Sequence, residues 1–233
     1  MQFPDPLIRG TLLRRYKRFL ADIELEDGAQ VTAHCANPGA MLGLKDAGAE
    51  VWLSPSRNPK RKLKFSWELI WANGGLVGIN TAHPNGIAAE AIEAGEIEPL
   101  QGYETLRREV KYGQNSRVDL LLEQPGRPDC YVEIKNVHLM RQTGLAEFPD
   151  SVTKRGAKHL VELGDMVAAG HRAVMLYLVQ RGDCDRFAIA GDIDPTYAEE
   201  LHRAMGSGVE AICYDCQIDT TGIQVRKPLQ LEL

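Results

Sequence analysis

Residues 117–135, RVDLLLEQPGRPDCYVEIK, decide the fold, because they read as two apolar strands joined by a turn rich in proline and glycine at residues 124–128. Side chains of a strand alternate between its two faces, so Glu133 and Lys135 on the second strand point the same way. Asp119, on the first strand, is expected to lie beside Glu133. Three charged groups are therefore expected at one place.

Two carboxylates in such a position repel each other and are costly to bury unpaired, so a cation should neutralise them. A site of hard oxygen ligands suits Mg²⁺ or Mn²⁺, and Lys135 would add a positive charge for a phosphate or a water. The spacing Asp-x13-Glu-x-Lys resembles the PD-(D/E)xK nuclease core. Because short patterns recur by chance, the alternative is a polar strand face with an ordinary ion pair between Glu133 and Lys135.

The composition is that of a globular protein. The chain has 233 residues, 44% hydrophobic and 25% charged, which is enough for one large or two small domains. It has no run of eighteen apolar residues, and its first residues lack the pattern of a secretion signal, so we expect neither membrane insertion nor export. Five cysteines, an odd number spread along the chain, suit free thiols. The predicted location is the cytoplasm.

Basic residues gather in the N-terminal third, although the net charge is −5. Residues 9–18 and 57–64 each contain five cations and no acid, with aromatic residues nearby. Such a pairing is typical of nucleic-acid binding, since rings stack on bases and cations contact phosphates. The alternative is that the rings are core and the cations a solvated surface. The candidates for DNA binding here are Arg14, Arg15, Lys17, Arg57, Lys60, Arg61, Lys62 and Lys64.

The first domain, residues 1–81, is predicted to be a small barrel. Turn signals such as Glu26-Asp27-Gly28 separate short apolar segments. About five strands in some eighty residues indicate a barrel of the OB type. We place the strands at 7–25, 30–35, 49–53, 62–71 and 76–80.

The second domain, residues 82–233, begins with a predicted helix at 86–95. A strand at 103–112 then leads through a turn at 113–115 into the central strand pair. A second helix is set up after Ser151, and an uninterrupted apolar strand at 173–179 suits a sheet covered on both faces.

The resulting order, αβββαβ, is that of the PD-(D/E)xK core. We therefore predict an α/β (α+β) protein, in which an OB-like barrel is followed by a nuclease-like mixed sheet flanked by helices. A strand at 186–190, a helix at 195–205 and a strand at 209–218 are expected to follow.

Four longer blocks extend the likeness over nearly the whole chain: AHCANPGAM at 33–41, REVKYGQNSRVD at 108–119, VEIKNV at 132–137 and FPDSVTKRGAKHL at 148–160. In these blocks the chain resembles the sugar fermentation stimulation protein A family. The resemblance implies DNA binding without sequence preference, a regulatory link to sugar use, and an OB-like domain paired with a nuclease-like one. Ala36 and Ala40 depart from the family's more usual Pro and Ser.

Residues and resemblance together predict a metal-dependent nuclease on a DNA-binding scaffold. Asp119 and Glu133 would hold Mg²⁺ or Mn²⁺ with the Ile134 carbonyl, and Lys135 would orient or activate the attacking water. The nuclease core usually adds a glutamate from the preceding helix, and we expect this to be Glu90, with Glu93 as the alternative. Further phosphate contacts are expected from Arg117, Lys154, Arg155 and Lys158.

Two other functions stay open at this point. One is a non-catalytic DNA-binding regulator of sugar metabolism, such as that of maltose, which keeps the acidic residues as a relic. The other is an RNA-processing protein that uses the barrel for single strands. The acidic site favours the nuclease, because a protein that only held phosphate would do better without buried carboxylates. A homodimer is compatible with each.

Overall fold

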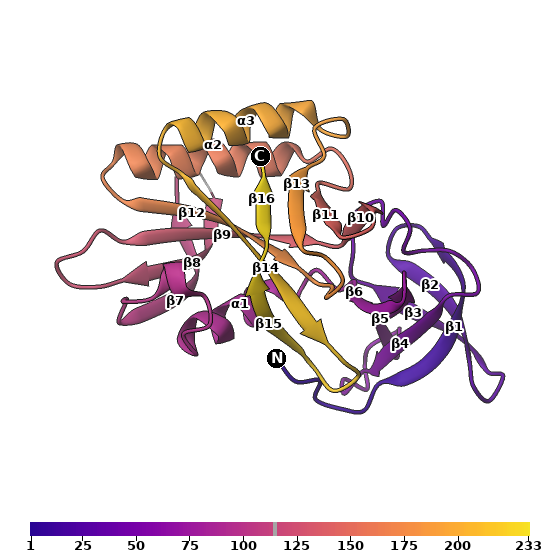
Figure 1. The fold of residues 1–233 in the computed structure, drawn as a ribbon. Helices are drawn as coiled ribbons and strands as arrows, with labels where there is room; N and C mark the ends of the chain where they lie inside the picture. The colour runs from indigo at the N-terminus through magenta and orange to yellow at the C-terminus, as the bar shows by residue number, and fades with distance from the viewer. Residues whose placement is uncertain (114–115) are drawn as a thin grey trace.

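The computed structural model describes residues 1–113 and 116–233, which form two parts (Figure 1). The first is a barrel, drawn in indigo and purple, and the second is a mixed sheet with helices. The barrel strands are β1 (Ile8–Tyr16), β2 (Leu20–Leu25), β3 (Gln30–Cys35), β4 (Glu50–Pro55), β5 (Phe65–Ala72) and β6 (Gly75–Gly78).

These strands hydrogen-bond in the order β3-β2-β1-β4-β5-β6. The barrel closes because β3 also pairs with β5 in parallel, with Cys35 opposite Trp67. Apolar side chains such as Leu12 and Trp67 fill its interior and are fully buried. The prediction of a small barrel is confirmed.

One predicted barrel strand was wrong in extent. The segment expected as a single strand at 7–25 is a hairpin, in which β1 and β2 pair antiparallel. Lys17 and Arg18 make its turn with φ values of 48° and 63°. Gly, Asn and Asp are the usual residues in this left-handed region, so two cations carried no turn signal.

The second part is built on a six-stranded sheet in the order β15-β14-β12-β9-β8-β7. β7, β8 and β9 form an antiparallel meander, whereas β9, β12 and β14 run parallel. Residues 173–179 of β12 are all buried, as predicted for a strand covered on both faces. The strands are β7 (Thr105–Tyr112), β8 (Ser116–Glu123), β9 (Cys130–Val137), β12 (Arg172–Val179), β14 (Glu210–Ile218) and β15 (Ile223–Pro228).

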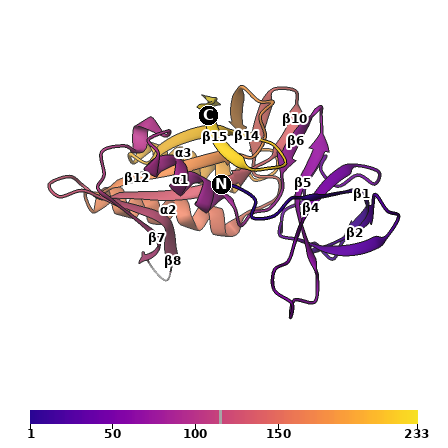
Figure 2. The ribbon, with the colours of Figure 1, turned by 90° about the horizontal axis from the view of Figure 1, so that it is seen from below.

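Helices cover both faces of this sheet, as the two views show (Figures 1 and 2). α1 (Pro84–Glu93) packs against β8, β9 and β15, and η1 (Glu98–Leu100) follows it. α2 (Lys154–Ala168) packs on the other face against β9 and β12, with α3 (Pro195–Gly206) beside it. None of the helices in the described ranges is long and apolar enough to cross a membrane. The predicted fold class is confirmed.

A small second sheet was not predicted, although one of its strands was expected at 186–190. It has the order β10-β11-β13-β16. Its strands have only three or four residues each, at or below the length at which alternation is informative. They are β10 (Leu139–Gln142), β11 (Leu145–Phe148), β13 (Arg186–Ile189) and β16 (Gln230–Glu232). The turn predicted at 113–115 includes Gln114 and Asn115, which lie outside the described residues.

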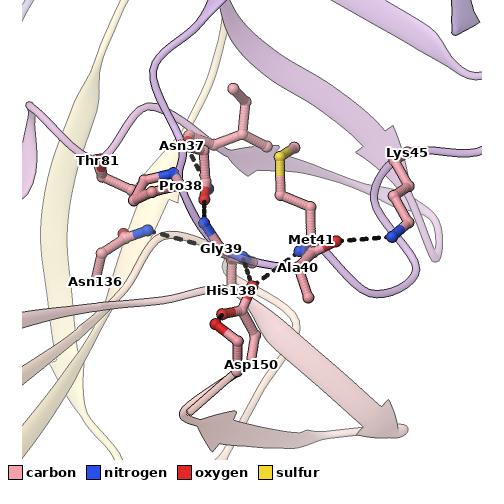
Figure 3. A network of polar contacts seen from close by, with 12 residues as sticks. Asn37, Pro38, Gly39, Ala40, Met41, Lys45, Thr81, Asn136, His138 and Asp150 are labelled. Atoms are coloured by element: carbon pink, nitrogen blue, oxygen red, sulfur yellow. Dashed lines mark hydrogen bonds and ion pairs between the residues drawn. The ribbon is translucent and has the colours of Figure 1, made fainter. Parts of the chain in front are cut away.

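The barrel contacts the second part through the loop that follows β3 (Figure 3). The backbone N–H of Met41 donates to Oδ2 of Asp150 at 2.9 Å, and Nε2 of His138 lies 3.4 Å from the same oxygen. A Cβ at Gly39 would come within 2.5 Å of that carboxylate, so glycine allows the close approach. Asp150, on the segment before α2, therefore joins the two parts.

Candidate metal and nucleic-acid site

Asp119 lies at an irregular point of β8. The residues on either side of it pair with β7, but pairing with β9 begins only at Leu120, and Glu109, opposite Asp119 on β7, has a φ of 55°. Such irregularities re-aim a side chain. The Asp119 carboxylate accepts from the backbone N–H of Ile134 at 2.7 Å and from Nδ2 of Asn85 at 2.8 Å. Asp119 thus fills the gap between β8 and β9.

Glu133, on β9, faces α2 and is 2% exposed. Its Oε1 accepts from Nζ of Lys135 at 2.8 Å and contacts Nδ1 of His159 on α2. Glu133 and Lys135 therefore share one face of β9, as their spacing predicts. Because Asp119 binds the backbone of the residue between them, the structure brings all three charged groups together.

His159 holds Glu133 from the side of α2. Its Nε2 lies 3.2 Å from Nε of Arg155, which can only donate, so Nε2 is the acceptor. A neutral ring whose Nε2 accepts carries its proton on Nδ1, and it donates that proton to Glu133. His159 is 4% exposed and is therefore part of the buried wall of the site.

The two carboxylates have pKa values that move in opposite directions. Burial raises the pKa of Asp119, and the negative charge of Glu133 raises it further. Burial also acts to raise the pKa of Glu133, but the hydrogen bond from His159 and the charge of Lys135 outweigh it and lower that pKa. The site thus favours an ionised Glu133 and disfavours a second negative charge at Asp119, which a cation would relieve.

Glu90 does not reach this site, which corrects the prediction that it assists there. It is exposed on α1, and it pairs with the N-terminal ammonium of Met1 at 2.6 Å. α1 instead presents Asn85 to Asp119. α1 begins at Pro84, two residues before its predicted start, and Asn85 in its first turn is the residue that contacts Asp119.

The oxygen atoms of the site fit a hard cation. No group of three His, Cys, Asp or Glu side chains within residues 1–113 and 116–233 is arranged to hold a metal alone. In the same ranges, however, Oε2 of Glu133 is buried without a hydrogen-bond partner. The Ile134 N–H faces Asp119, and in an antiparallel ladder the C=O of a residue faces the same neighbour as its N–H. Two carboxylates and this carbonyl suit Mg²⁺ or Mn²⁺, which keeps several waters.

Three of the predicted phosphate-binding residues lie along the start of α2. Lys154, Arg155 and Lys158 are all exposed there. Arg155 contacts His159, and Nζ of Lys158 lies 3.3 Å from Glu162, so this row of cations borders the acidic site directly.

Arg117 is also exposed near the site, on β8. It lies directly opposite Lys111 on β7, and both side chains are exposed. Like charges in directly opposite positions destabilise a ladder, which favours an anion as their partner. Lys111 was not singled out from the sequence.

Three of the barrel cations already have partners within the protein. Arg14 pairs with Asp22 at 2.8 Å, and Arg57 pairs with Asp5 at 2.7 Å. Arg15 donates to two backbone carbonyls of the loop after β3. Arg14 thus bonds across the β1–β2 hairpin, Arg57 to the segment before β1, and Arg15 to a loop.

The remaining barrel cations are more open. Lys17 is exposed in the turn between β1 and β2, and Lys60, Lys62 and Lys64 are exposed in the loop between β4 and β5. Arg61 and Lys64 donate within their own loop. For the ammonium groups of Lys60 and Lys62, the described part of the chain contains no hydrogen-bond or ion-pair partner.

Four residues of the site were not assigned from the sequence. Burial of His159 and Glu162 could have been inferred, because they lie three positions apart on α2 and thus on one face with Leu160 and Leu163. No local sequence signal marks Asn85 and Tyr112, because their positions depend on how α1 and β7 pack. The four are Asn85, Tyr112, His159 and Glu162.

Fold and site together define a class: an OB-like barrel joined to an α/β domain whose central strands bring two carboxylates and a lysine together. Family models match the same two parts, with residues 13–79 matching the "SfsA N-terminal OB domain" and residues 82–222 the "Sugar fermentation stimulation protein RE domain". The chain belongs to the sugar fermentation stimulation protein A (SfsA) family.

Similar proteins cover the full chain. It is 61% identical over 233 residues to the sugar fermentation stimulation protein homolog of Paramagnetospirillum magneticum, with 100% of this chain and 98% of that protein covered. The homolog of Rhodospirillum centenum is 64% identical over 231 residues, with 99% of each chain covered. Among solved structures, Pyrococcus furiosus SfsA in complex with Ca²⁺ is similar with a TM-score of 0.89 and 26% identity, and all of both chains is covered.

Proposed function

We propose that this protein is a Mg²⁺- or Mn²⁺-dependent nuclease that binds DNA without sequence preference and hydrolyses phosphodiester bonds. The observation that carries the proposal is at the junction of β8 and β9, where the Asp119 carboxylate binds the N–H of Ile134 beside the buried Glu133 and Lys135. The Ca²⁺ bound by the Pyrococcus furiosus relative supports a divalent cation here.

Each residue of the junction has a separate task in this reaction. A divalent cation, when bound, would polarise the phosphate and lower the pKa of a water molecule. Asp119, Glu133 and the Ile134 carbonyl would hold it. Lys135, whose ammonium donates a hydrogen bond to Glu133, would orient the water or offset the charge of the phosphate. His159 holds Glu133 in place from α2.

DNA would be held by two groups of cations, one on each part of the molecule. The barrel, residues 1–81, would hold the backbone mainly through Lys17, Lys60 and Lys62, which are exposed. Residues 82–233 would carry the chemistry and hold phosphates near the cleavage point. Those second contacts would come from Arg117, Lys154, Arg155 and Lys158.

The test compares the parent protein with Asp119→Asn. Melting temperatures are measured with and without manganese, and cleavage is assayed on supercoiled, linear, branched and single-stranded DNA. Manganese at a hundred times its Kd should raise the parent's melting temperature by roughly 5–10 °C. Without metal the variant should melt no lower than the parent, because it removes a repelling charge. Its cleavage should fall at least about 100-fold, since even outer-shell partners of a metal contribute about 10- to 100-fold.

Lys135→Ala serves as the second variant, because the lysine is no metal ligand. It should keep the manganese-dependent rise in melting temperature and DNA binding, yet lose cleavage. Manganese stabilisation of the parent without cleavage of any substrate would contradict the nuclease. Absence of both effects would contradict the metal site as well.

One observation favours a non-catalytic DNA-binding regulator as the second candidate. Lys135 and His159 both contact Oε1 of Glu133, so that carboxylate is neutralised without a metal. A protein selected only to hold DNA could use these contacts to stabilise β9. In that case Asp119→Asn would raise the melting temperature whether or not manganese is present, and DNA binding would be unchanged.

A further inference from the structure

A third carboxylate, Glu162, lies next to the proposed site and has no task in the reaction described above. Its side chain is 6% exposed. Oε1 accepts from Oγ of Ser116 at 2.9 Å and pairs with Nζ of Lys158 at 3.3 Å. Oε2 is buried, and residues 1–113 and 116–233 contain no hydrogen-bond partner for it. One oxygen of this carboxylate is therefore buried and unpaired.

Two other oxygen atoms near the site are also buried and unpaired, the hydroxyl of Tyr112 and Oε2 of Glu133. Neither has a hydrogen-bond partner in the described part of the chain. Tyr112 is 8% exposed and Glu133 is 2% exposed, so both side chains are buried. Buried polar atoms are nearly always paired in native proteins, and three unpaired oxygens in one region indicate a missing partner.

The elements that carry these three atoms meet at one place. His159 contacts Glu133, and Glu162 follows His159 by three positions, so the two side chains lie on the same face of α2. Tyr112 lies opposite Ser116 in the ladder of β7 and β8, and Ser116 donates to Glu162. α2, β9 and the hairpin of β7 and β8 thus deliver the three oxygens to the same region.

The electrostatics of Tyr112 agree with this geometry. Burial raises the pKa of its hydroxyl, and the negative charges of Glu133, Glu162 and Asp119 raise it further. All three carboxylates are therefore close enough to act on the phenol oxygen. A divalent cation is the partner that this charge distribution favours, because it compensates several carboxylates at once.

We propose that Glu162 and Glu133 hold a second divalent cation, with the Tyr112 hydroxyl donating to one of its water ligands. The inference rests on the proposed function and deepens it: Glu133 would be shared between this cation and the one held by Asp119. Two carboxylates with water and phosphate oxygens are a sufficient ligand set for Mg²⁺ or Mn²⁺. A pair of cations clamps the attacking and leaving oxygens of a phosphodiester, which makes a DNA or RNA backbone the substrate class.

The test counts manganese ions on the full-length protein by equilibrium dialysis with Mn²⁺ alone. The parent should bind two ions, Glu162→Gln should bind one, and the remaining ion should keep its affinity within about threefold. Asp165→Asn is the matched control, since it removes one charge from an exposed position one turn further along α2. It should bind two ions. Electron paramagnetic resonance should show coupled Mn²⁺ in the parent and in Asp165→Asn, and uncoupled Mn²⁺ in Glu162→Gln.

Tyr112→Phe provides a second variant in case Glu162→Gln does not fold. It keeps the ring and should weaken only the second ion, by about 10-fold, as expected for an outer-shell partner. One ion on the parent with no effect of Glu162→Gln would overturn this inference and leave the proposed function intact. Loss of all manganese in Glu162→Gln would also overturn it, because Glu162 would then serve a single cation. A parent that binds none would overturn the proposed function itself.

Discussion

Gly156 lies in the first turn of α2, where a side chain has no room. A Cβ there would come within 2.9 Å of the Thr153 side chain and 3.0 Å of the Tyr197 ring. Thr153 is the N-cap, and its hydroxyl accepts from the Gly156 N–H at 3.1 Å. Tyr197 is fully buried and its hydroxyl bonds to that of Tyr177, so neither neighbour can yield. Glycine at this position therefore lets α2 approach α3 and sets the place of His159.

Gly156→Ala should lower the free energy of unfolding by about 1–3 kcal/mol, the usual effect of overpacking. Gly164→Ala, two turns further along α2, has open space at the Cβ and should raise it by about 0.5–1 kcal/mol, because alanine favours a helix interior. Urea unfolding of both variants checks the pair. Equal effects of the two substitutions would contradict the packing argument.

At the scale of elements, the loop between β4 and β5 is the most open basic segment of the barrel. Arg61 donates to Ser66 at 2.9 Å and Lys64 to the Pro59 carbonyl at 2.8 Å, so these two residues stabilise the loop itself. Lys60 and Lys62 are exposed and without such bonds in the described part of the chain. The ammonium groups of Lys60 and Lys62 are therefore accessible to phosphates.

Replacing Lys60 and Lys62 together by Ala should weaken DNA binding for all sequences and flatten its salt dependence. Each lost phosphate contact lowers the slope of log K against log salt by about 0.9 on duplex DNA, so a decrease of roughly two is expected. Mobility-shift titrations at several salt concentrations measure it. Lys227→Ala combined with Arg203→Ala removes the same charge from β15 and α3, and its slope should stay near that of the parent. An unchanged slope in the loop variant would place DNA binding elsewhere.

At the scale of the whole molecule, the barrel is tied to the strand that carries the site. The amide of Gln180 donates to the backbone carbonyl of Asn80 at 3.2 Å and to Oδ1 of Asn136 at 2.6 Å. Asn136 directly follows Lys135 on β9. Close to Asn136, Asp150 accepts the Met41 N–H from the barrel (Figure 3). The two parts are therefore held together by polar bonds near the end of β9.

Asp150→Asn should weaken this connection in a pH-dependent way. Burial acts to raise the pKa of Asp150, but hydrogen bonding to His138, Met41 and Ser151 outweighs it and lowers the pKa from 3.8 to about 2. A pKa lowered on folding stabilises the protein at every pH above 3.8, here by about 2 kcal/mol, and this contribution is lost as the pH falls from 3.8 toward 2. The variant should therefore be about 2 kcal/mol less stable at pH 7, and the difference should shrink below pH 4. Urea unfolding at pH 7, 5 and 3 measures it, and a difference that stays constant with pH would contradict the role of the charge.

Much of the fold and part of the site could be read from the sequence, because those features depend on neighbouring residues. The alternation around Asp119 and Glu133 and the proline-glycine turn between them are local, and they predicted the two central strands correctly. The apolar run at 173–179 likewise predicted a strand covered on both faces. The shared face of Glu133 and Lys135 follows from the geometry of any strand.

The tertiary structure alone decided which other side chains meet these residues. Glu90 pairs with Met1, and Asn85 contacts Asp119 where Glu90 was expected. The reason is that the face of α1 turned toward β8 depends on how the helix packs. Tyr112 and Glu162 come from β7 and α2, and no spacing along the chain relates them to Glu133. Helical and strand periodicity indicate which face of an element is buried, but not the partner it is buried against. That choice is made by long-range packing of the whole domain, which is why the unpaired oxygens of the site became visible only in the folded protein.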